Sequence, residues 1–269
     1  MSTIPPEDID TQGHAGLLIG SQWSPPGDPT WVAVIAHGYG EHIGRYQWVA
    51  ERLTADGAVV YGHDHVGHGR SEGERVLVED FERVVDDLHL LVQRAHEEHP
   101  DLPLVLIGHS MGGMIAARYT QRHPESLTAT VLSGPVLGSW EPTALADLDE
   151  IPPTPIDITT LSRDPDVGRA YEADELVWHG DFTRPTLLAL RACLETITAG
   201  GRLQVPTIWL HGADDQLVPI DRSDEGWAHI APDGAPSKRY PGARHEIFNE
   251  TNREEVLDDV LAFVHEHIG

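Results

Sequence analysis

One stretch of the chain decides the fold: Leu104-Val105-Leu106-Ile107-Gly108-His109-Ser110-Met111-Gly112. Its first four residues are apolar and predict a short buried strand, and residues 111–122 have the alanine and glycine content of a helix start. A strand, a tight turn and a helix in this order lift a serine hydroxyl above the edge of a sheet. The glycines two positions before and after Ser110 leave no Cβ to collide with the neighbouring strand or helix. Ser110 is therefore the candidate nucleophile.

A serine nucleophile needs a base that takes its proton and a carboxylate that orients the base. The predicted strand 207–210 runs into a loop that carries Asp214 and Asp215, and either carboxylate could orient a base. His245 follows a further short strand and a glycine turn, and it is the candidate base. The order serine, aspartate, histidine along the chain is that of the α/β-hydrolases.

A third loop can complete such a site. Residues 32–36 predict a strand that leads into His37-Gly38-Tyr39-Gly40. This loop can turn the backbone N–H of Tyr39 toward the same point as the backbone N–H of Met111. Two such donors would form an oxyanion hole for the charge that develops when a serine attacks a carbonyl carbon. Together these features predict a serine hydrolase.

Composition and charge narrow the function classes. The 269 residues carry 44 acidic and 18 basic side chains, only one of them a lysine, for a net charge of −26. This charge repels nucleic acid and anionic lipid headgroups, so no nucleic-acid partner is expected. The lone Cys193 rules out an internal disulfide and favours a cytoplasmic location. The first eight residues lack the pattern of a secretory signal, and no apolar run approaches the roughly 20 residues that span a bilayer.

The chain alternates apolar runs with helical patterns such as 45–54 and 81–95. This alternation predicts an α/β fold, with a mostly parallel sheet flanked by helices. Between residues 135 and 204 prolines and short helical patterns replace the strands, which predicts a small helical cap inserted after the sixth strand, residues 129–133. The expected organisation is one catalytic domain made of residues 1–134 and 205–269, interrupted by the cap.

The later cap helix, about residues 184–197, is rich in leucine. Leu187, Leu190 and Leu194 would either cover the active site and hold an acyl chain, or pack the cap onto the core. The early cap, residues 138–151, carries four acidic residues and shows no clear apolar face. Docking on a bilayer needs an apolar face helped by basic residues, so weak or no membrane association is expected.

The chain resembles the monoacylglycerol lipases of the α/β-hydrolase superfamily over nearly its whole length. The resemblance rests on residues 37–46, 62–73, 108–113, 161–165 and 170–174 and on the loops around Asp215 and His245. It implies that Asp215, in the family pattern Gly-x-x-Asp, is the acid and that Asp214 is a solvated neighbour. It also implies an α/β-hydrolase fold and no cofactor.

The resemblance further implies that Glu41, Arg45 and Tyr171 line the polar end of the substrate pocket. Glu41 and Arg45 are four residues apart, so they could instead pair with each other at a helix start. The family often has a histidine three residues after the catalytic one, where this chain has Phe248. This difference would favour a less polar leaving alcohol.

A cluster of imidazoles and a carboxylate at His63-Asp64-His65 and His68 could in principle hold zinc. The spacing matches no known set of zinc ligands. In the family that the chain resembles, Asp64, Gly67, Gly69 and Ser71 occupy the positions of a structural turn. No metal is therefore expected.

The resulting hypothesis is a serine ester hydrolase that cleaves single-chain acylglycerols, with a small lipid or ester as its substrate. A lysophospholipase, a thioesterase or a short-chain carboxylesterase would use the same residues. A ligand-binding module of the same fold, without catalysis, is the alternative from a different class. Such modules usually lose a member of the triad, whereas this chain has all three. The sequence does not indicate an oligomeric state.

Overall fold

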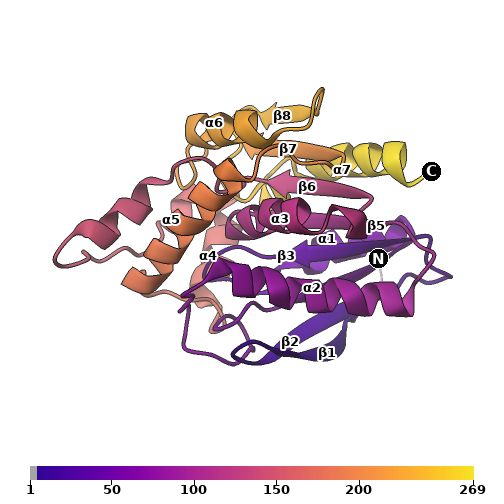
Figure 1. Cartoon of the computed structure of the whole chain (residues 1–269), viewed down its shortest axis with the longest axis horizontal. Helices are drawn as coiled ribbons and strands as arrows, with labels where there is room; N and C mark the ends of the chain where they lie inside the picture. The colour runs from indigo at the N-terminus through magenta and orange to yellow at the C-terminus, as the bar shows by residue number, and fades with distance from the viewer. Residues whose placement is uncertain (1–4) are drawn as a thin grey trace.

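A twisted sheet runs through the middle of the molecule (Figure 1). This computed structural model describes residues 5–269. The prediction that the first eight residues are not a secretory signal falls partly on Met1 to Ile4, which lie outside the described residues. Within that range the sheet has eight strands in the order β1-β2-β4-β3-β5-β6-β7-β8. The strands are β1 (Glu7–Gly13), β2 (Gly16–Trp23), β3 (Trp31–Ala36), β4 (Ala58–His63), β5 (Leu104–His109), β6 (Ala129–Ser133), β7 (Thr207–Gly212) and β8 (Ser237–Tyr240). β2 runs antiparallel to β1 and β4, and all other neighbours are parallel, as predicted.

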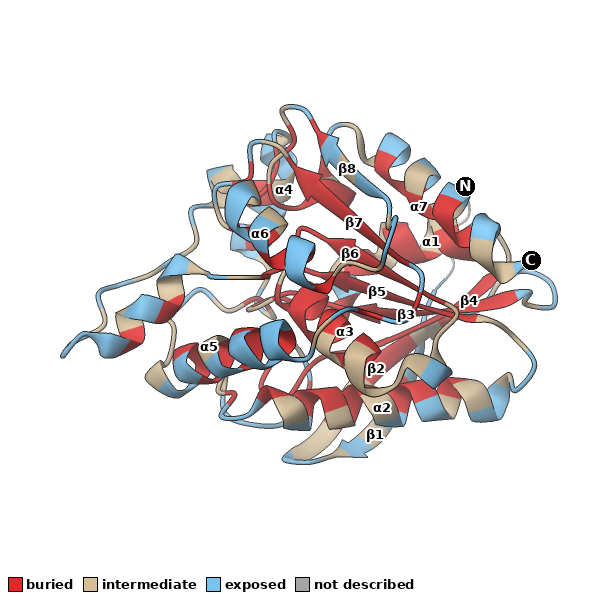
Figure 2. Cartoon of the chain, turned by 45° about the horizontal axis from the view of Figure 1, so that its top comes forward, coloured by how far each residue is buried: buried red, intermediate tan, exposed pale blue. Residues whose placement is uncertain are grey.

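Helices cover both faces of the sheet. α2 (Phe81–Glu98), α3 (Met111–Arg122) and α6 (Ile220–Ile230) pack on one face, and α1 (Gln47–Ala55) and α7 (Arg253–Ile268) on the other. All residues of the inner strands β3 to β7 are buried (Figure 2). Strands that are covered on both faces must be apolar throughout, which explains the continuous apolar runs of the sequence.

The helical cap lies between β6 and β7. In the described chain this segment contains no strand. It holds the short 3-10 helices η3 (Glu141–Asp147) and η4 (Ile158–Thr160) and the helices α4 (Pro165–Ala173) and α5 (Arg184–Ala199). α5 packs against α3 and η3. It is tied to the core by Thr186, whose hydroxyl donates to the Val76 carbonyl at 2.9 Å and accepts from the Val78 N–H at 2.9 Å.

Candidate active site

The turn between β5 and α3 holds Ser110 in a strained backbone conformation. Its φ is +56°, and among the described non-glycine residues only Val76 shares such a positive value. A Cβ on Gly108 would lie 2.3 Å from the Gly112 carbonyl oxygen, and one on Gly112 would lie 2.1 Å from the Ala36 carbonyl oxygen. The two glycines are therefore required by close packing, as the sequence predicted. Strain that is held by its surroundings is typical of functional sites.

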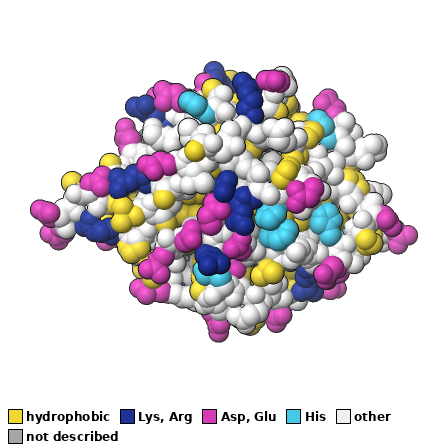
Figure 3. All heavy atoms as spheres, viewed as in Figure 1, with side chains coloured by type: hydrophobic (Ala, Val, Ile, Leu, Met, Phe, Trp, Pro, Cys, Tyr) yellow, Lys and Arg dark blue, Asp and Glu magenta, His cyan; other side chains and the backbone are white. Residues whose placement is uncertain are grey.

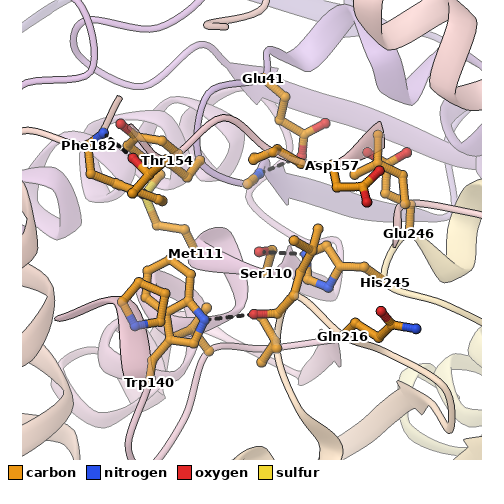
Figure 4. Close-up of a pocket in the computed structure, with 18 of the residues that line it drawn as sticks. Glu41, Ser110, Met111, Trp140, Thr154, Asp157, Phe182, Gln216, His245 and Glu246 are labelled. Atoms are coloured by element: carbon orange, nitrogen blue, oxygen red, sulfur yellow. Dashed lines mark hydrogen bonds between the residues drawn. The ribbon is translucent and has the colours of Figure 1, made fainter. Parts of the chain in front are cut away.

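The loop after β7 brings an aspartate to this serine, and the loop after β8 brings a histidine. His245 Nε2 lies 2.9 Å from Ser110 Oγ, and His245 Nδ1 lies 2.7 Å from Asp215 Oδ2 (Figure 4 shows the contact with Ser110). The other carboxylate oxygen of Asp215 accepts from the backbone N–H groups of Leu217 and Val218, both at 2.9 Å. The neighbouring Asp214 is exposed. The geometry thus places Asp215, and not Asp214, beside His245.

The pKa shifts of Asp215 and His245 suit general-base catalysis by the histidine. Burial alone would raise the pKa of Asp215, but the adjacent His245 and His211 hold this pKa well below its usual range. Burial alone would lower the pKa of His245, yet the Asp215 carboxylate raises it above the usual histidine value. His211 was missed by the sequence analysis: its Nε2–H donates to the Val218 carbonyl at 2.9 Å and approaches Asp215 Oδ2 at 3.2 Å. The charged state of Asp215 is stabilised on both sides.

The candidate oxyanion donors, Tyr39 and Met111, lie at the cavity into which Ser110 opens. Tyr39 and Met111 both line it, and within the described residues neither backbone N–H has a protein acceptor. Gly40 has a φ of +75°, so the loop that presents Tyr39 uses a conformation that glycine adopts without strain. A Cβ on Gly38 would lie 2.9 Å from Glu41 Oε1 and 3.2 Å from Ser110 Cβ, so a larger residue there would push on the buried Glu41 carboxylate and on the nucleophile.

Glu41, Arg45 and Tyr171 come together beside the triad. Glu41 accepts from the Gly38 N–H at 2.6 Å, from the Tyr46 hydroxyl at 2.7 Å and from Arg45 at 2.6 Å. Arg45 also makes a bidentate ion pair with Glu246, and its guanidinium lies 5.0 Å from the centre of the Tyr171 ring. Burial alone would raise the pKa of Glu41, but Arg45 holds it below its usual value. Both readings of the pair therefore hold: Glu41 and Arg45 bind each other and also line the pocket.

These residues surround a cavity of about 640 Å³. In Figure 4 Trp140 and Phe182 lie on one side of Ser110, and Asp157 and Glu246 lie on the other. The apolar lining includes Met111, Val136, Trp140, Leu145, Phe182 and Leu190, and the polar lining includes Glu41, Arg45, Asp157, Tyr171 and Glu246. The cavity thus has an apolar part and a polar part, with the serine between them.

The three leucines of α5 do not share one role. Leu190 lines the cavity, whereas Leu187 and Leu194 do not; both are buried in the core between α5 and the rest of the domain. The prediction that all three hold substrate is therefore corrected for Leu187 and Leu194, which pack the cap onto the core. All three side chains belong to the same buried core cluster, and an apolar pattern alone does not reveal that only Leu190 of the three also reaches the cavity.

Two aromatic side chains that the sequence analysis did not single out, Trp140 and Phe182, line one side of the cavity. The ring of Phe182 stacks on Tyr39 with 4.4 Å between centres and meets Trp140 edge-on at 5.6 Å. Trp140 is fixed by a hydrogen bond from its indole N–H to the Leu217 carbonyl at 2.8 Å. Phe182 belongs to an irregular segment with no periodic signal, so no sequence pattern pointed to it. Glu246 was also missed, although its position next to His245 could have indicated it.

The histidine cluster is a packed part of the core. His37, His63, His65 and His68 are buried, and burial lowers the pKa of all four, to about 4 for His63 and His68. Asp64 caps its own turn by accepting from the backbone N–H groups of Ile43 and Arg70, both at 2.8 Å. These bonds agree with the structural turn that the family resemblance implied. No group of three or more side chains that could hold a metal ion occurs in the part of the chain that the structure describes.

The cap surface differs in one respect from the expectation. Leu148, just after η3, is 46% exposed and Leu188 on α5 is 42% exposed. Figure 3 shows hydrophobic side chains gathered at the cap, with acidic side chains at its outer tip. The cap is therefore acidic but not uniformly polar, and the expectation of weak membrane association stays a prediction. In residues 5–269, no helix has the length and apolar character of a membrane span.

Comparisons with known proteins agree with this geometry. Residues 27–252 match the family described as serine aminopeptidase, S33. A monoacylglycerol lipase of Mycolicibacterium smegmatis is 39% identical over 91% of this chain and 92% of its own length. A monoglyceride lipase of Rattus norvegicus is 33% identical over 89% of this chain and 82% of its own.

A solved structure extends the likeness to three dimensions. The monoacylglycerol lipase of Paleococcus ferrophilus superposes with a TM-score of 0.81 at 26% identity, covering 93% of this chain and 99% of the other. The architecture, the juxtaposed serine, histidine and aspartate, and the extended sequence identity lead to one assignment. The chain belongs to the monoacylglycerol lipase family of serine hydrolases with the α/β-hydrolase fold.

Proposed function

We propose that this enzyme hydrolyses single-chain acylglycerols to glycerol and a fatty acid. One observation carries the proposal: Ser110, already in contact with His245, lies between the apolar and the polar parts of one cavity. A monoacylglycerol has the same division, since its ester carbonyl separates an alkyl chain from two hydroxyl groups. The family relatives that carry the name monoacylglycerol lipase support the same substrate class.

The reaction follows from the geometry. His245 Nε2 takes the proton of Ser110 Oγ as this oxygen attacks the ester carbonyl carbon, and Asp215 stabilises the resulting imidazolium. The backbone N–H groups of Tyr39 and Met111 donate to the oxyanion. The alcohol leaves with the proton from His245, and a water molecule then cleaves the acyl-enzyme by the same steps.

The lining indicates how a substrate lies in the cavity. The acyl chain occupies the apolar part beside Trp140, Phe182 and Leu190. The alcohol lies at the polar part, where the buried Tyr171 hydroxyl has no partner among the described residues and can bind a substrate hydroxyl. Glu41 and Arg45 are largely occupied by each other, by Gly38 and by Glu246, so they shape this end more than they bind the alcohol.

A substrate series tests the proposal. Monoolein should be hydrolysed far faster than triolein, because two further acyl chains would desolvate the charged groups at the polar end. Such desolvation costs several kcal/mol, roughly, and several kcal/mol slow turnover by orders of magnitude. The rate should also show no jump as a single-chain ester passes its solubility limit. Triolein cleaved as fast as monoolein would rule the proposal out.

The charge of the substrate headgroup can distinguish a monoacylglycerol lipase from a lysophospholipase. Glu141 and Asp157 line the cavity, and within residues 5–269 neither carboxylate forms an ion pair. We expect wild-type enzyme at low salt to cleave a lysophosphatidylglycerol more slowly than a monoacylglycerol of equal chain length. Replacing Glu141→Gln and Asp157→Asn together should raise kcat/KM for the anionic ester roughly three- to tenfold, and less so at high salt. Monoacylglycerol hydrolysis should change less than this, because asparagine at position 157 keeps the side-chain oxygen that accepts from Thr159.

The matched control is Asp149→Asn, which removes a charge from the same cap but does not line the cavity. It should leave the ratio of the two rates unchanged. Equal wild-type rates on both esters at low salt would favour the lysophospholipase instead. Labelling of Ser110 by a fluorophosphonate excludes the non-catalytic binding module directly. A cytoplasmic location is part of the proposal, supported by the single buried, unpaired thiol of Cys193.

A further inference from the structure

The loop that carries His245 is held from outside the core by the cap. Its backbone N–H groups at His245 and Glu246 donate to the carbonyls of Thr160 and Leu161, at 3.4 and 2.8 Å. The Arg244 guanidinium donates to the Ser162 carbonyl at 3.0 Å, and the Ser162 hydroxyl donates to the Asn249 carbonyl at 3.0 Å. Residues 159–163, which we call the clamp segment, thus lie along the whole loop from residue 244 to residue 250.

A buried carboxylate, that of Glu250, joins the histidine loop to the clamp segment. Glu250 Oε1 accepts from the backbone N–H groups of Arg244 and Arg163, at 2.8 and 3.0 Å. Glu250 Oε2 accepts from Arg163 Nε and from the Thr251 N–H, both at 2.9 Å. The Glu250 side chain is fully buried, while that of Arg163 is 34% exposed. One charged group therefore fixes both ends of the histidine loop and the clamp segment at once.

The position of this contact matters for catalysis. Arg244 and Glu246 flank His245 in the chain, so any movement of the loop changes the distances from His245 to Ser110 and to Asp215. A misplacement of about 1 Å in a catalytic group costs roughly 10²-fold in rate. A carboxylate with four N–H partners is a strong anchor, because hydrogen bonds to an ionised acceptor are about twice as strong as neutral ones.

We propose that Glu250 is a positioning residue for His245 and that the clamp segment of the cap is part of the catalytic machinery. The inference rests on the proposed function only for the roles of Ser110, His245 and Asp215. In this view the cap has two parts: the clamp segment, which begins in η4, holds the catalytic histidine, whereas η3 and α5 bound the substrate cavity.

The test is Glu250→Gln, assayed with p-nitrophenyl butyrate and by the rate of fluorophosphonate labelling. Glutamine keeps the shape but loses the ion pair, and its amide nitrogen cannot accept from N–H groups. We expect kcat to fall roughly 10- to 100-fold with KM nearly unchanged. The acid limb of the kcat/KM profile should move to lower pH, because a looser loop weakens the contact with Asp215 that raises the pKa of His245.

The other ionisable groups that face His245 keep their chemical identity in this variant. They are Asp215, His109, Glu41, Arg45 and Glu246. The matched control is Glu254→Gln, four residues further along, which removes the exposed ion pair between the first turn of α7 and Arg52 of α1. It should change neither kcat nor the pH profile. Both readouts depend on the triad and not on acylglycerol specificity, so failure of the substrate proposal would leave this test standing.

A second variant covers the case that Glu250→Gln does not fold. Arg163→Met removes the side-chain bonds to Glu250 and Asn252 and keeps the backbone N–H bond to Glu250, so we expect a several-fold loss of kcat with a smaller shift of the pH limb in the same direction. Arg163→Lys, which keeps the charge, should recover most of the activity. Loss of thermal stability in Glu250→Gln with unchanged kcat and an unmoved pH profile would overturn the proposal, as would the same result for Arg163→Met.

Discussion

Replacing Ser110 with alanine is expected to abolish ester hydrolysis and leave the fold intact. The Ser110 hydroxyl has one protein partner among the described side chains, His245 Nε2, so its removal strands no other buried group. Loss of the nucleophile of a hydrolytic triad lowers kcat by roughly 10⁶-fold. Hydrolysis of p-nitrophenyl butyrate, fluorophosphonate labelling and thermal unfolding followed by circular dichroism would measure the effect.

A serine elsewhere on the surface provides the control for Ser110→Ala. Ser237 begins β8 and is exposed, so Ser237→Ala should keep wild-type rates and labelling. The Ser110→Ala protein should unfold at a temperature close to that of the wild type, because alanine tolerates the same positive φ as well as serine does. Activity above about one part in a thousand of wild type would mean that another residue serves as nucleophile.

The sequence was sufficient for the frame of the site because parallel strands end at one edge of the sheet. Apolar runs predicted β3, β5, β6 and β7, and the residues that follow such strands must meet at their carboxyl ends. Ser110, Asp215 and the Tyr39 loop each follow one of these strands. Their convergence therefore needed no knowledge of side-chain packing. The choice of Asp215 over Asp214 came from the family resemblance, and the geometry agrees with it.

Contacts made across the cap could not be read in this way. Leu187, Leu190 and Leu194 follow the same helical pattern, yet only Leu190 reaches the cavity, because the docking angle of α5 decides which face is turned inward. Phe182 and Glu250 act through residues far away in the chain. The apolar pattern of one element carries no information about its partners in other elements. Periodicity therefore predicted the helices and strands but not the side-chain contacts between them.

Replacing Asp215 with asparagine should cost far more activity than replacing Asp214. Asparagine can keep the bonds from Leu217 and Val218 through its oxygen, but its nitrogen would then face His245 Nδ1. An N–H donor at that position favours the tautomer of His245 that carries its proton on Nε2, and this nitrogen can no longer take the proton of Ser110. The loss of such an orienting carboxylate reaches roughly 10⁴-fold in kcat.

Two measurements check this prediction. The acid limb of the kcat/KM profile should move to lower pH than in wild type, because the carboxylate that raises the pKa of His245 is gone. Asp214→Asn makes the same chemical change one residue earlier, at an exposed position, and should stay within about twofold of wild type, since exposed substitutions away from a site have small effects. If Asp214→Asn were the inactive variant, the acid would have been assigned to the wrong residue. Asp215 could then only shape its loop, through Leu217 and Val218, and His245 would need a different partner to hold its tautomer.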